Sequence, residues 1–347
     1  MGTPYSCPIT ISATTTLKTL AYGSGIPTSA TRTFIYTRVV PVSSVRINVG
    51  GLAVGSFAAD SGFGTTSVQG AGATVSVSGV PNAAPASLYD TERWSTEAFS
   101  YTSPILTAGR AYTVRLHFAE RYVSTVGARR FNVALNGATA GGLFLANLDV
   151  FAAAGNAMNK AVVRSFTGVA PAADGKITVT FSLGSAQLPM VNGIEILSEA
   201  TALEIFRTTH GLSADGSQDL AKPAGDGVPN LLKFAFNLIG PANGQAVNLQ
   251  SPVATLLAPS GSFGMPVSAR QSSGALRVSF LRRKSTSYPG IAYAVEFSDS
   301  LHSGSWLENP SAVFAVESVD SVFERVSVTD HLLTPKQRFA RLRVTAQ

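Results

Sequence analysis

Cysteine is almost absent from this 347-residue sequence, which contains only Cys7. No disulfide can form within the chain, so the fold cannot depend on one. The sequence also lacks an apolar run of the ~20 residues that a membrane-spanning helix needs. Its start, MGTPY, has neither the basic residues nor the apolar core of a signal peptide. We therefore expect no membrane span, and we expect the chain to be a fragment of a longer protein.

Charged residues are scarce, at 13% of the sequence, and the net charge of +6 is spread along the chain. Residues 1–42 contain three basic and no acidic residues, residues 43–199 ten and nine, and residues 200–347 thirteen and eleven. The one basic run is Arg282-Arg283-Lys284. Because nucleic-acid-binding domains usually concentrate positive charge on one face, this distribution argues against nucleic acid as a partner.

Short alternating segments between turn residues dominate the middle of the chain. In residues 112–118, YTVRLHF, every second residue is apolar, which places those side chains on one face of a strand. Residues 131–135 and 177–181 alternate in the same way, beside the hairpin signals Asn136-Gly137 and Asp174-Gly175. With no useful helical period between residues 44 and 198, the sequence predicts a mainly β fold with an antiparallel sandwich or jelly roll here.

The flanking regions are predicted to differ from this unit. Residues 1–42 contain short strands, at 9–12, 16–22 and 31–37, but too few large apolar side chains for a core of their own. Residues 200–245 are predicted as a helical connector, with an amphipathic helix at 202–210 and a second helix capped by Asp226. Residues 246–347 return to strands, which predicts a small second β-sandwich. Its strands are expected at residues 276–281, 293–297, 323–328 and 339–344.

Several motifs in residues 43–199 resemble the malectin family. In order, they are RINVGG with FAAD, LYDTERW, FSYTSPI, YTVRLHFAERY, RRFNVALNG, LDVFAAAGNAMNKAVVRSF and VNGIEIL. The resemblance implies a galactose-binding-like jelly roll. It also implies non-catalytic binding of a carbohydrate, a glucose-type oligosaccharide or polysaccharide, by a module of a larger extracellular or cell-surface bacterial protein.

Looser resemblances cover the two ends of the chain. The stretch PITISATTTLKTLAYGSGIPTSATRTFIYT resembles the second half of the small β-domain found at the ends of chitobiases and β-hexosaminidases. The segment from Phe206 onward resembles a C-terminal region of large secreted or surface proteins of Verrucomicrobia-like bacteria, which implies no known activity. We thus expect four parts: a partial β-domain at 1–42, a malectin-like domain at 43–199, a connector at 200–245 and a sandwich at 246–347.

The malectin resemblance implies a sugar site at one rim of the sandwich. Trp94, which follows a Thr-Glu-Arg turn, and Tyr122 match positions where family members contact sugar. Aromatic rings stack on the apolar C–H face of a pyranose, so both residues are expected to do so. The alternative for each ring is packing within the rim itself. Val123 stands where the family has a second aromatic, which removes a stacking surface.

Three further sugar contacts are expected. Phe63 lies in the first glycine-rich loop, at the place of a family aromatic. Glu120 ends a strand, where it can contact sugar or cap a loop. Gln187 is the nearest polar match to an acidic ligand contact of the family, and an amide can bond two hydroxyl groups.

Two other functions compete with sugar binding. Val123 favours a structural or adhesion spacer whose sugar site has decayed. Glu92 and Glu120 suggest a glycoside hydrolase, which needs two carboxylates about 5 Å or 6.5–9.5 Å apart. Nothing in the resemblance implies hydrolysis, however, so we expect no enzyme activity. We expect Glu92 and Arg93 to pair and so fix their turn.

No cofactor is expected, and calcium is only a weak candidate. Asp215, Asp219 and Asp226 are spaced somewhat like an acidic calcium loop, but Lys222 and Ala224 occupy two positions where such loops have acidic ligands. Because calcium takes six or more oxygen ligands, the loss of two carboxylates argues against a site. The favoured role of Asp226 is to cap the helix that follows it.

Overall fold

The protein is described by a computed structural model. It describes residues 4, 9, 14–25, 27–36, 40–60, 67–68, 74–223, 227–239, 256–332 and 337–347. The chain divides into two compact units. Unit 1 consists of residues 1–108, 116–164 and 171–195, and unit 2 of residues 109–115, 165–170 and 196–347.

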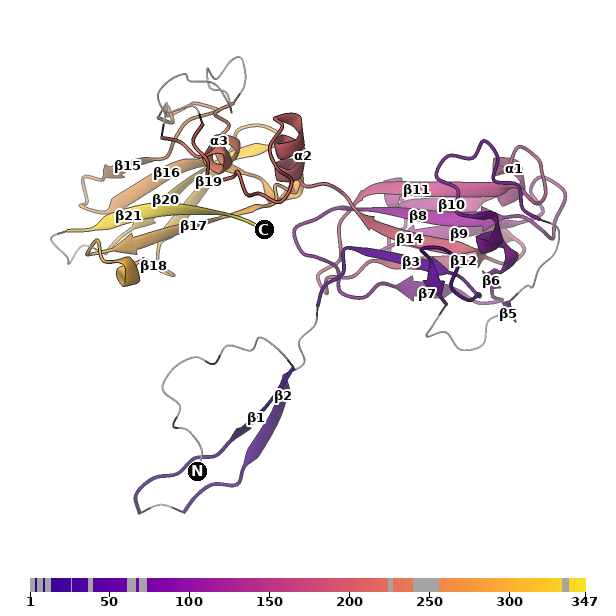
Figure 1. Ribbon diagram of the computed structural model, residues 1–347, viewed down its shortest axis with the longest axis horizontal. Helices are drawn as coiled ribbons and strands as arrows, with labels where there is room; N and C mark the ends of the chain where they lie inside the picture. Colours follow the sequence, from indigo (N-terminus) through magenta and orange to yellow (C-terminus); the bar gives the residue numbers. More distant parts are fainter. Residues whose placement is uncertain are drawn as a thin grey trace. The chain divides into compact units, whose positions relative to one another are not determined.

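The N-terminal part forms an isolated hairpin of β1 (Thr15–Thr19) and β2 (Arg32–Tyr36) (Figure 1). Leu17 lies opposite Phe34, but Phe34 is 47% exposed and Ile35 is 71% exposed. The hairpin thus lacks a packed core, in line with the scarcity of large apolar residues. The strand predicted at 9–12 lies largely outside the described residues.

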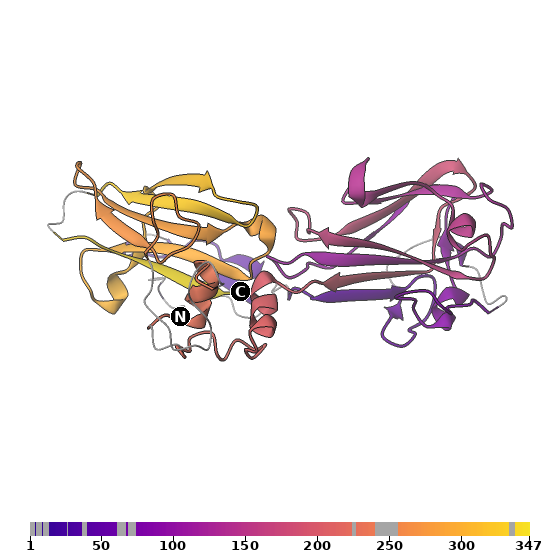
Figure 2. The ribbon, with the colours of Figure 1, turned by 90° about the horizontal axis from the view of Figure 1, so that it is seen from above.

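The middle of the chain forms a sandwich of two sheets (Figures 1 and 2). One sheet has the order β10-β9-β12-β7, from β7 (Phe99–Thr102), β9 (Arg130–Leu135), β10 (Phe144–Leu148) and β12 (Thr178–Ala186). The other has the order β11-β8-β14-β3-β4, from β3 (Ser44–Asn48), β4 (Ala58–Ala59), β8 (Tyr112–Ala119), β11 (Ala161–Val169) and β14 (Gly193–Ser198).

The core of this sandwich lies between the sheets, where the sequence predicted it. The ring of Phe118 on β8 contacts Phe131 on β9 at 5.8 Å and Phe181 on β12 at 6.5 Å between ring centroids. All three side chains are fully buried, as expected from the alternating pattern. The predicted mainly β fold is therefore confirmed.

Two details of the predicted topology are wrong. Asp174-Gly175 does not close a hairpin, because it joins β11 to β12, which belong to different sheets. The second sheet is not wholly antiparallel, because β3 and β4 pair in parallel. Asn136-Gly137 does lie in the connection of a hairpin, between β9 and β10, and both residues have positive φ.

Short elements gather at the end of the first sandwich that carries β6 and α1 (Figure 1). A small third sheet has the order β13-β6-β5. The elements are β5 (Ser67–Val68), β6 (Arg93–Trp94), β13 (Met190–Val191), the 3₁₀ turn η1 (Ala86–Asp90) and helix α1 (Val150–Ala153). The 3₁₀ turn η2 (Gly141–Leu143) lies at the other end of the sandwich, in the connection from β9 to β10.

The rest of unit 2 begins with two helices and continues as a second sandwich. Its elements are α2 (Ala202–Thr209), α3 (Asn230–Ala235), β15 (Val267–Arg270), β16 (Leu276–Arg283), η3 (Ser285–Ser287), β17 (Ile291–Ser298), η4 (Ser303–Ser305), β18 (Leu307–Glu308), β19 (Val313–Ser318), β20 (Phe323–Asp330) and β21 (Phe339–Ala346). The sheets have the orders β15-β16-β20-β19 and β18-β17-β21.

Both predicted helices exist: α2 starts at Ala202 as predicted and ends one residue earlier, whereas α3 starts later than predicted. A capping box begins α2: the side chain of Thr201 accepts from the Glu204 amide, and Glu204 accepts from the Thr201 amide. Helix α3 starts only at Asn230, with Pro229 at its N-cap position, so the prediction of Asp226 as the cap is wrong. Asp226 itself lies outside the described residues.

All three side chains of the basic run have partners within the fold. Arg282 forms an ion pair with Glu324, and Lys284 donates to the carbonyl of Asp320. The guanidinium of Arg283 lies 3.8 Å from the ring centroid of Phe234 and 4.5 Å from that of Phe323, while its Nε donates to the Phe234 carbonyl. Arg283 thus fastens α3 to the sheet by cation–π contacts.

Candidate functional site

One fully buried asparagine draws together the loops at the rim of the first sandwich. The Asn192 side chain accepts from the Ala119 amide at the end of β8 and donates to the carbonyl of Thr91, both at 2.8 Å. Its carbonyl accepts from the Val49 amide, just after β3. The ends of β3 and β8, the start of β14 and the loop before β6 therefore meet at one place.

Among the described residues of this rim, Tyr122 has the most exposed ring, with 74% of its surface accessible. The turn that carries it is held by the carboxylate of Glu120. One Glu120 oxygen accepts from the amides of Tyr122 (2.9 Å) and Val123 (3.0 Å), and the other accepts from Nε of Arg129 (2.8 Å). The Tyr122 backbone is therefore fixed, while its ring faces solvent.

Glu120 itself is fully buried. Its three bonds give it a supporting role beneath Tyr122, and a direct contact with sugar would require the carboxylate to leave them. The same bonds argue against its use in acid–base catalysis. Its contact with a sugar stays a prediction.

Arg129 links this turn to the turn that carries Gln187, between β12 and β13. The Nη1 atom of Arg129 donates to the carbonyl of Leu188 at 2.8 Å, while its Nε holds Glu120. Gln187 is exposed and has a positive φ of 55°. The structure thus brings Tyr122 and the turn with Gln187 together around one buried arginine.

Trp94 is a strand residue, not the exposed turn residue that the sequence suggested. It lies on β6, opposite Met190 on β13 and Ser67 on β5, and is partly buried. Its position beside β13 keeps it at the same end of the sandwich as Gln187. Phe63 lies outside the described residues.

Arg93 does not pair with Glu92, as the sequence suggested, but with Asp60. Its Nη2 lies 2.6 Å from Oδ2 of Asp60, which also accepts from the Tyr101 hydroxyl and the Gly50 amide. Burial, reinforced by the charge of Asp60, raises the pKa of Tyr101, so its hydroxyl remains a donor. Because adjacent side chains of an extended segment point in opposite directions, the side chains of Glu92 and Arg93 lie on opposite sides of it.

Glu92 is only 6% exposed, and its Oε2 has no hydrogen-bond partner among the described residues. Burial raises its pKa; the charge of Arg129 lowers it, and that of Glu120 raises it. A raised pKa suits a general acid. However, the Oε2 atom is inaccessible, so the pair Glu92 and Glu120 offers no open approach to a substrate.

A chain of buried hydrogen bonds, here called the relay, holds η1 in place. The Tyr89 hydroxyl lies 3.1 Å from Nδ1 of His117, whose Nε2 lies 3.0 Å from Glu195, and Glu195 also pairs with Arg46. Donors and acceptors match along the chain when the His117 proton is on Nε2. Burial raises the pKa of Tyr89 to about 12, so its hydroxyl can donate to the ring. The relay fixes the turn that leads to Trp94.

The calcium candidates have other partners where the structure describes them. Asp219 forms a two-point ion pair with Arg207, at 3.0 and 2.6 Å. Asp215 is exposed and accepts from the Ser217 amide, a bond that lowers its pKa. Across the described ranges, no three His, Cys, Asp or Glu side chains gather as a metal site.

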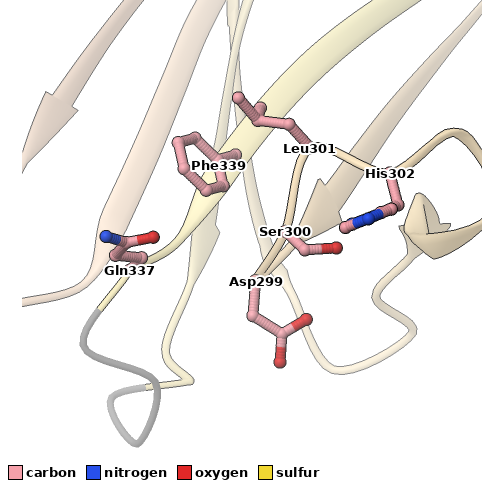
Figure 3. Close-up of a pocket in the computed structure, with 6 residues that line it drawn as sticks. All are labelled: Asp299, Ser300, Leu301, His302, Gln337 and Phe339. Atoms are coloured by element: carbon pink, nitrogen blue, oxygen red, sulfur yellow. The ribbon is translucent and has the colours of Figure 1, made fainter.

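A separate pocket of about 410 Å³ lies in unit 2. It is lined by Asp299, Ser300, Leu301, His302, Gln337 and Phe339 (Figure 3). The side chains of Asp299 and His302 point in different directions, so their polar groups do not converge on one ligand position (Figure 3). None of the sequence-predicted site residues lies here.

The rim contains three important residues that the sequence did not single out: Asp60, Arg129 and Asn192. Each acts through partners distant in sequence, such as Asp60 with Arg93 and Asn192 with Thr91. Each lies within a motif of the malectin resemblance: Asp60 ends FAAD, Arg129 begins RRFNVALNG, and Asn192 is in VNGIEIL. The motifs mark these residues but do not identify their distant partners.

Residues 43–194 match the family model of the malectin domain, a carbohydrate-binding type of module. Among solved structures, the ANXUR1 extracellular domain from Arabidopsis thaliana is 20% identical, with a TM-score of 0.40, covering 45% of this chain and 48% of that one. The plant FER complex with the peptide RALF23 and LLG2 is 22% identical, with a TM-score of 0.39, covering 46% and 49%.

A Bacteroides uniformis β-glucuronidase is 15% identical, with a TM-score of 0.34, covering 53% of this chain and 22% of that one. The chain thus spans half or less of the length of these solved structures. No curated protein sequence matches it. Among the described helices, none is long and apolar enough to cross a membrane.

Proposed function

We propose that residues 43–194 bind a glycan without catalysis, as a module of a larger extracellular bacterial protein. The observation that carries this proposal is the exposed ring of Tyr122 on a turn locked by the buried carboxylate of Glu120. A fixed ring loses little conformational freedom when it stacks on a pyranose, and this favours binding. Gln187 is exposed nearby and supplies hydrogen bonds to sugar hydroxyls.

Support for a role in sugar binding is weaker for three other residues: Trp94, Phe63 and Glu120. Trp94 lies at the same rim but is partly buried, so only part of its ring is available. Phe63 is proposed from the family resemblance alone. Glu120 acts chiefly by holding the Tyr122 turn. We expect affinity in the micromolar to millimolar range, because shallow sugar sites stay wet.

Replacing Tyr122 by alanine tests the proposal. Loss of the ring should cost about 1–3 kcal/mol of binding free energy, or roughly 5- to 150-fold in Kd, with folding unchanged. A glycan array identifies a glucose-type oligosaccharide, and calorimetry then compares the variants. Tyr22→Ala is the matched control, since Tyr22 is 61% exposed but lies beside the N-terminal hairpin. Equal affinity of both variants would contradict the proposal.

One observation favours a second candidate, a structural or adhesion spacer. Val123 follows Tyr122, where the family resemblance implies a second, adjacent aromatic. On this view the rim network survives as a purely structural feature. A glycan array with no binding above background at high protein concentration would support the spacer and reject the lectin.

A further inference from the structure

Strand β19 is an edge strand with an apolar, exposed sequence, VFAVES. All six of its residues are exposed, including Phe314 at 59% and Val316 at 53%. Edge strands of natural proteins are usually short, or carry lysine, proline or inward charges that prevent pairing with another chain. Strand β19 has none of these features.

The other edges of the same sandwich are protected. Strand β18 has two residues, and β15 has four and ends in Arg270. Strand β21 has Arg341 and Arg343, which both pair with Glu296 of β17. Strand β19 is therefore the exception among the described edges of the second sandwich.

Two of the exposed apolar residues of β19, Phe314 and Val316, belong to the inner face of its sheet. Phe314 lies opposite Val328 and Val316 opposite Val326, and both of these β20 valines are buried in the core. Directly opposed residues of an antiparallel pair share a face. The core-side surface of the sheet thus continues onto β19, where it is open to solvent.

We propose that β19 pairs antiparallel with β19 of a second copy of this chain, about a two-fold axis at Ala315. This register places Phe314 opposite Val316 of the second copy, and Val316 opposite its Phe314. Both are aromatic–β-branched pairs, which stabilise sheets. The inner faces of the two sheets then form one continuous surface.

The charges and the register of β19 both fit a second copy of this chain as the partner. The carboxylate of Glu317 lies opposite Val313 of the second copy and is already paired with Arg325 at 2.8 Å, so no like charges oppose each other. Moving the axis to Val316 would place Phe314 against Ser318, and moving it to Phe314 would place Val316 against Ala312. A shift by one residue would set the inner face of one copy against the outer face of the other.

Pairing gives the assembly two malectin domains. Weak binding of each rim to a repeated glycan is then strengthened by avidity. The pairing itself does not depend on the sugar site, so the two proposals fail separately.

Sedimentation of the full chain over a range of concentrations tests the association. We expect a reversible dimer, and Val316→Lys should raise its Kd by about tenfold or more, because two lysines would be brought to the shared edge. Leu220→Lys is the control, because Leu220 is 74% exposed in the same unit. A wild-type chain that stays monomeric throughout overturns the proposal.

Cysteine cross-linking tests the register even where Val316→Lys folds poorly. In a Cys7→Ser background, Ala315→Cys should form an intermolecular disulfide on mild oxidation, since the axis sets the two thiols opposite each other. Leu220→Cys in the same background should not. A dimer that survives Val316→Lys, together with an Ala315→Cys variant that stays unlinked, would overturn the proposal, because the dimer must then use another surface.

Discussion

Both units bury ion pairs, but they use them differently. In unit 1, Glu120–Arg129 holds the turn that presents Tyr122 to solvent, and Asp60–Arg93 holds β6 to the end of β3. In unit 2, Arg207–Asp219 holds α2 against the segment that follows it, and among the described residues of α2 and that segment no aromatic ring is exposed. A buried pair by itself thus indicates structure, whereas a pair that holds the turn of an exposed ring indicates a prepared binding surface.

The largest expected effect comes from breaking one pair in each unit. Glu120→Ala and Asp219→Ala each leave a buried guanidinium unpaired, so each should cost about 3–5 kcal/mol of stability. Calorimetric unfolding should show the loss of stability in unit 1 for Glu120→Ala and in unit 2 for Asp219→Ala. Glycan binding should fail only in Glu120→Ala, measured at a temperature where both variants are folded. Equal loss of binding in both would remove the distinction between the units.

Trp94→Ala should have an intermediate effect. Trp94 is only partly buried on β6, so we expect a loss of about 1–3 kcal/mol of stability, less than for a fully buried tryptophan. Glycan affinity should fall as well. A melting temperature far below that of the parent, with affinity kept, would make Trp94 a core residue and remove it from the site.

Glu92→Gln should have the smallest effect, visible as a change with pH. Burial raises the folded-state pKa of Glu92, so its contribution to stability is complete below the unfolded value, about 4.3, and is lost as pH rises through the folded value. The glutamine stays neutral, so the stability of Glu92→Gln relative to wild type should increase between pH 4 and pH 7. A difference that does not change with pH would contradict the assigned shift.

The sequence predicted the strands of the first core because alternation is a local property. Tyr112, Val114, Leu116 and Phe118 are all fully buried on one face of β8, as predicted. Prediction from the sequence failed where pairing between distant strands decides the structure. The Thr-Glu-Arg sequence predicts a turn position for Trp94, but pairing with Met190 and Ser67, far along the chain, makes it a strand residue. Asp174-Gly175 predicts a hairpin, but a dipeptide cannot show whether its flanking strands share a sheet.

The site was predicted only in part, for the same reason. Tyr122 and Trp94 came from a motif resemblance, but the residues that hold them did not. Arg129 reaches Glu120, nine residues away, and Leu188, fifty-nine residues away. Such contacts are set by the way the loops meet at the rim, which has no local signature.

The most direct test of the central claim is a chemical-shift titration of the backbone amides with a glucose-type oligosaccharide. The Tyr122 and Val123 amides both donate to Glu120, so stacking on the Tyr122 ring should shift these signals first. Signals near Gln187 should follow, with those of β16 and β20 unchanged. Saturable shifts confined to unit 2, or no shifts at millimolar ligand, would contradict the account.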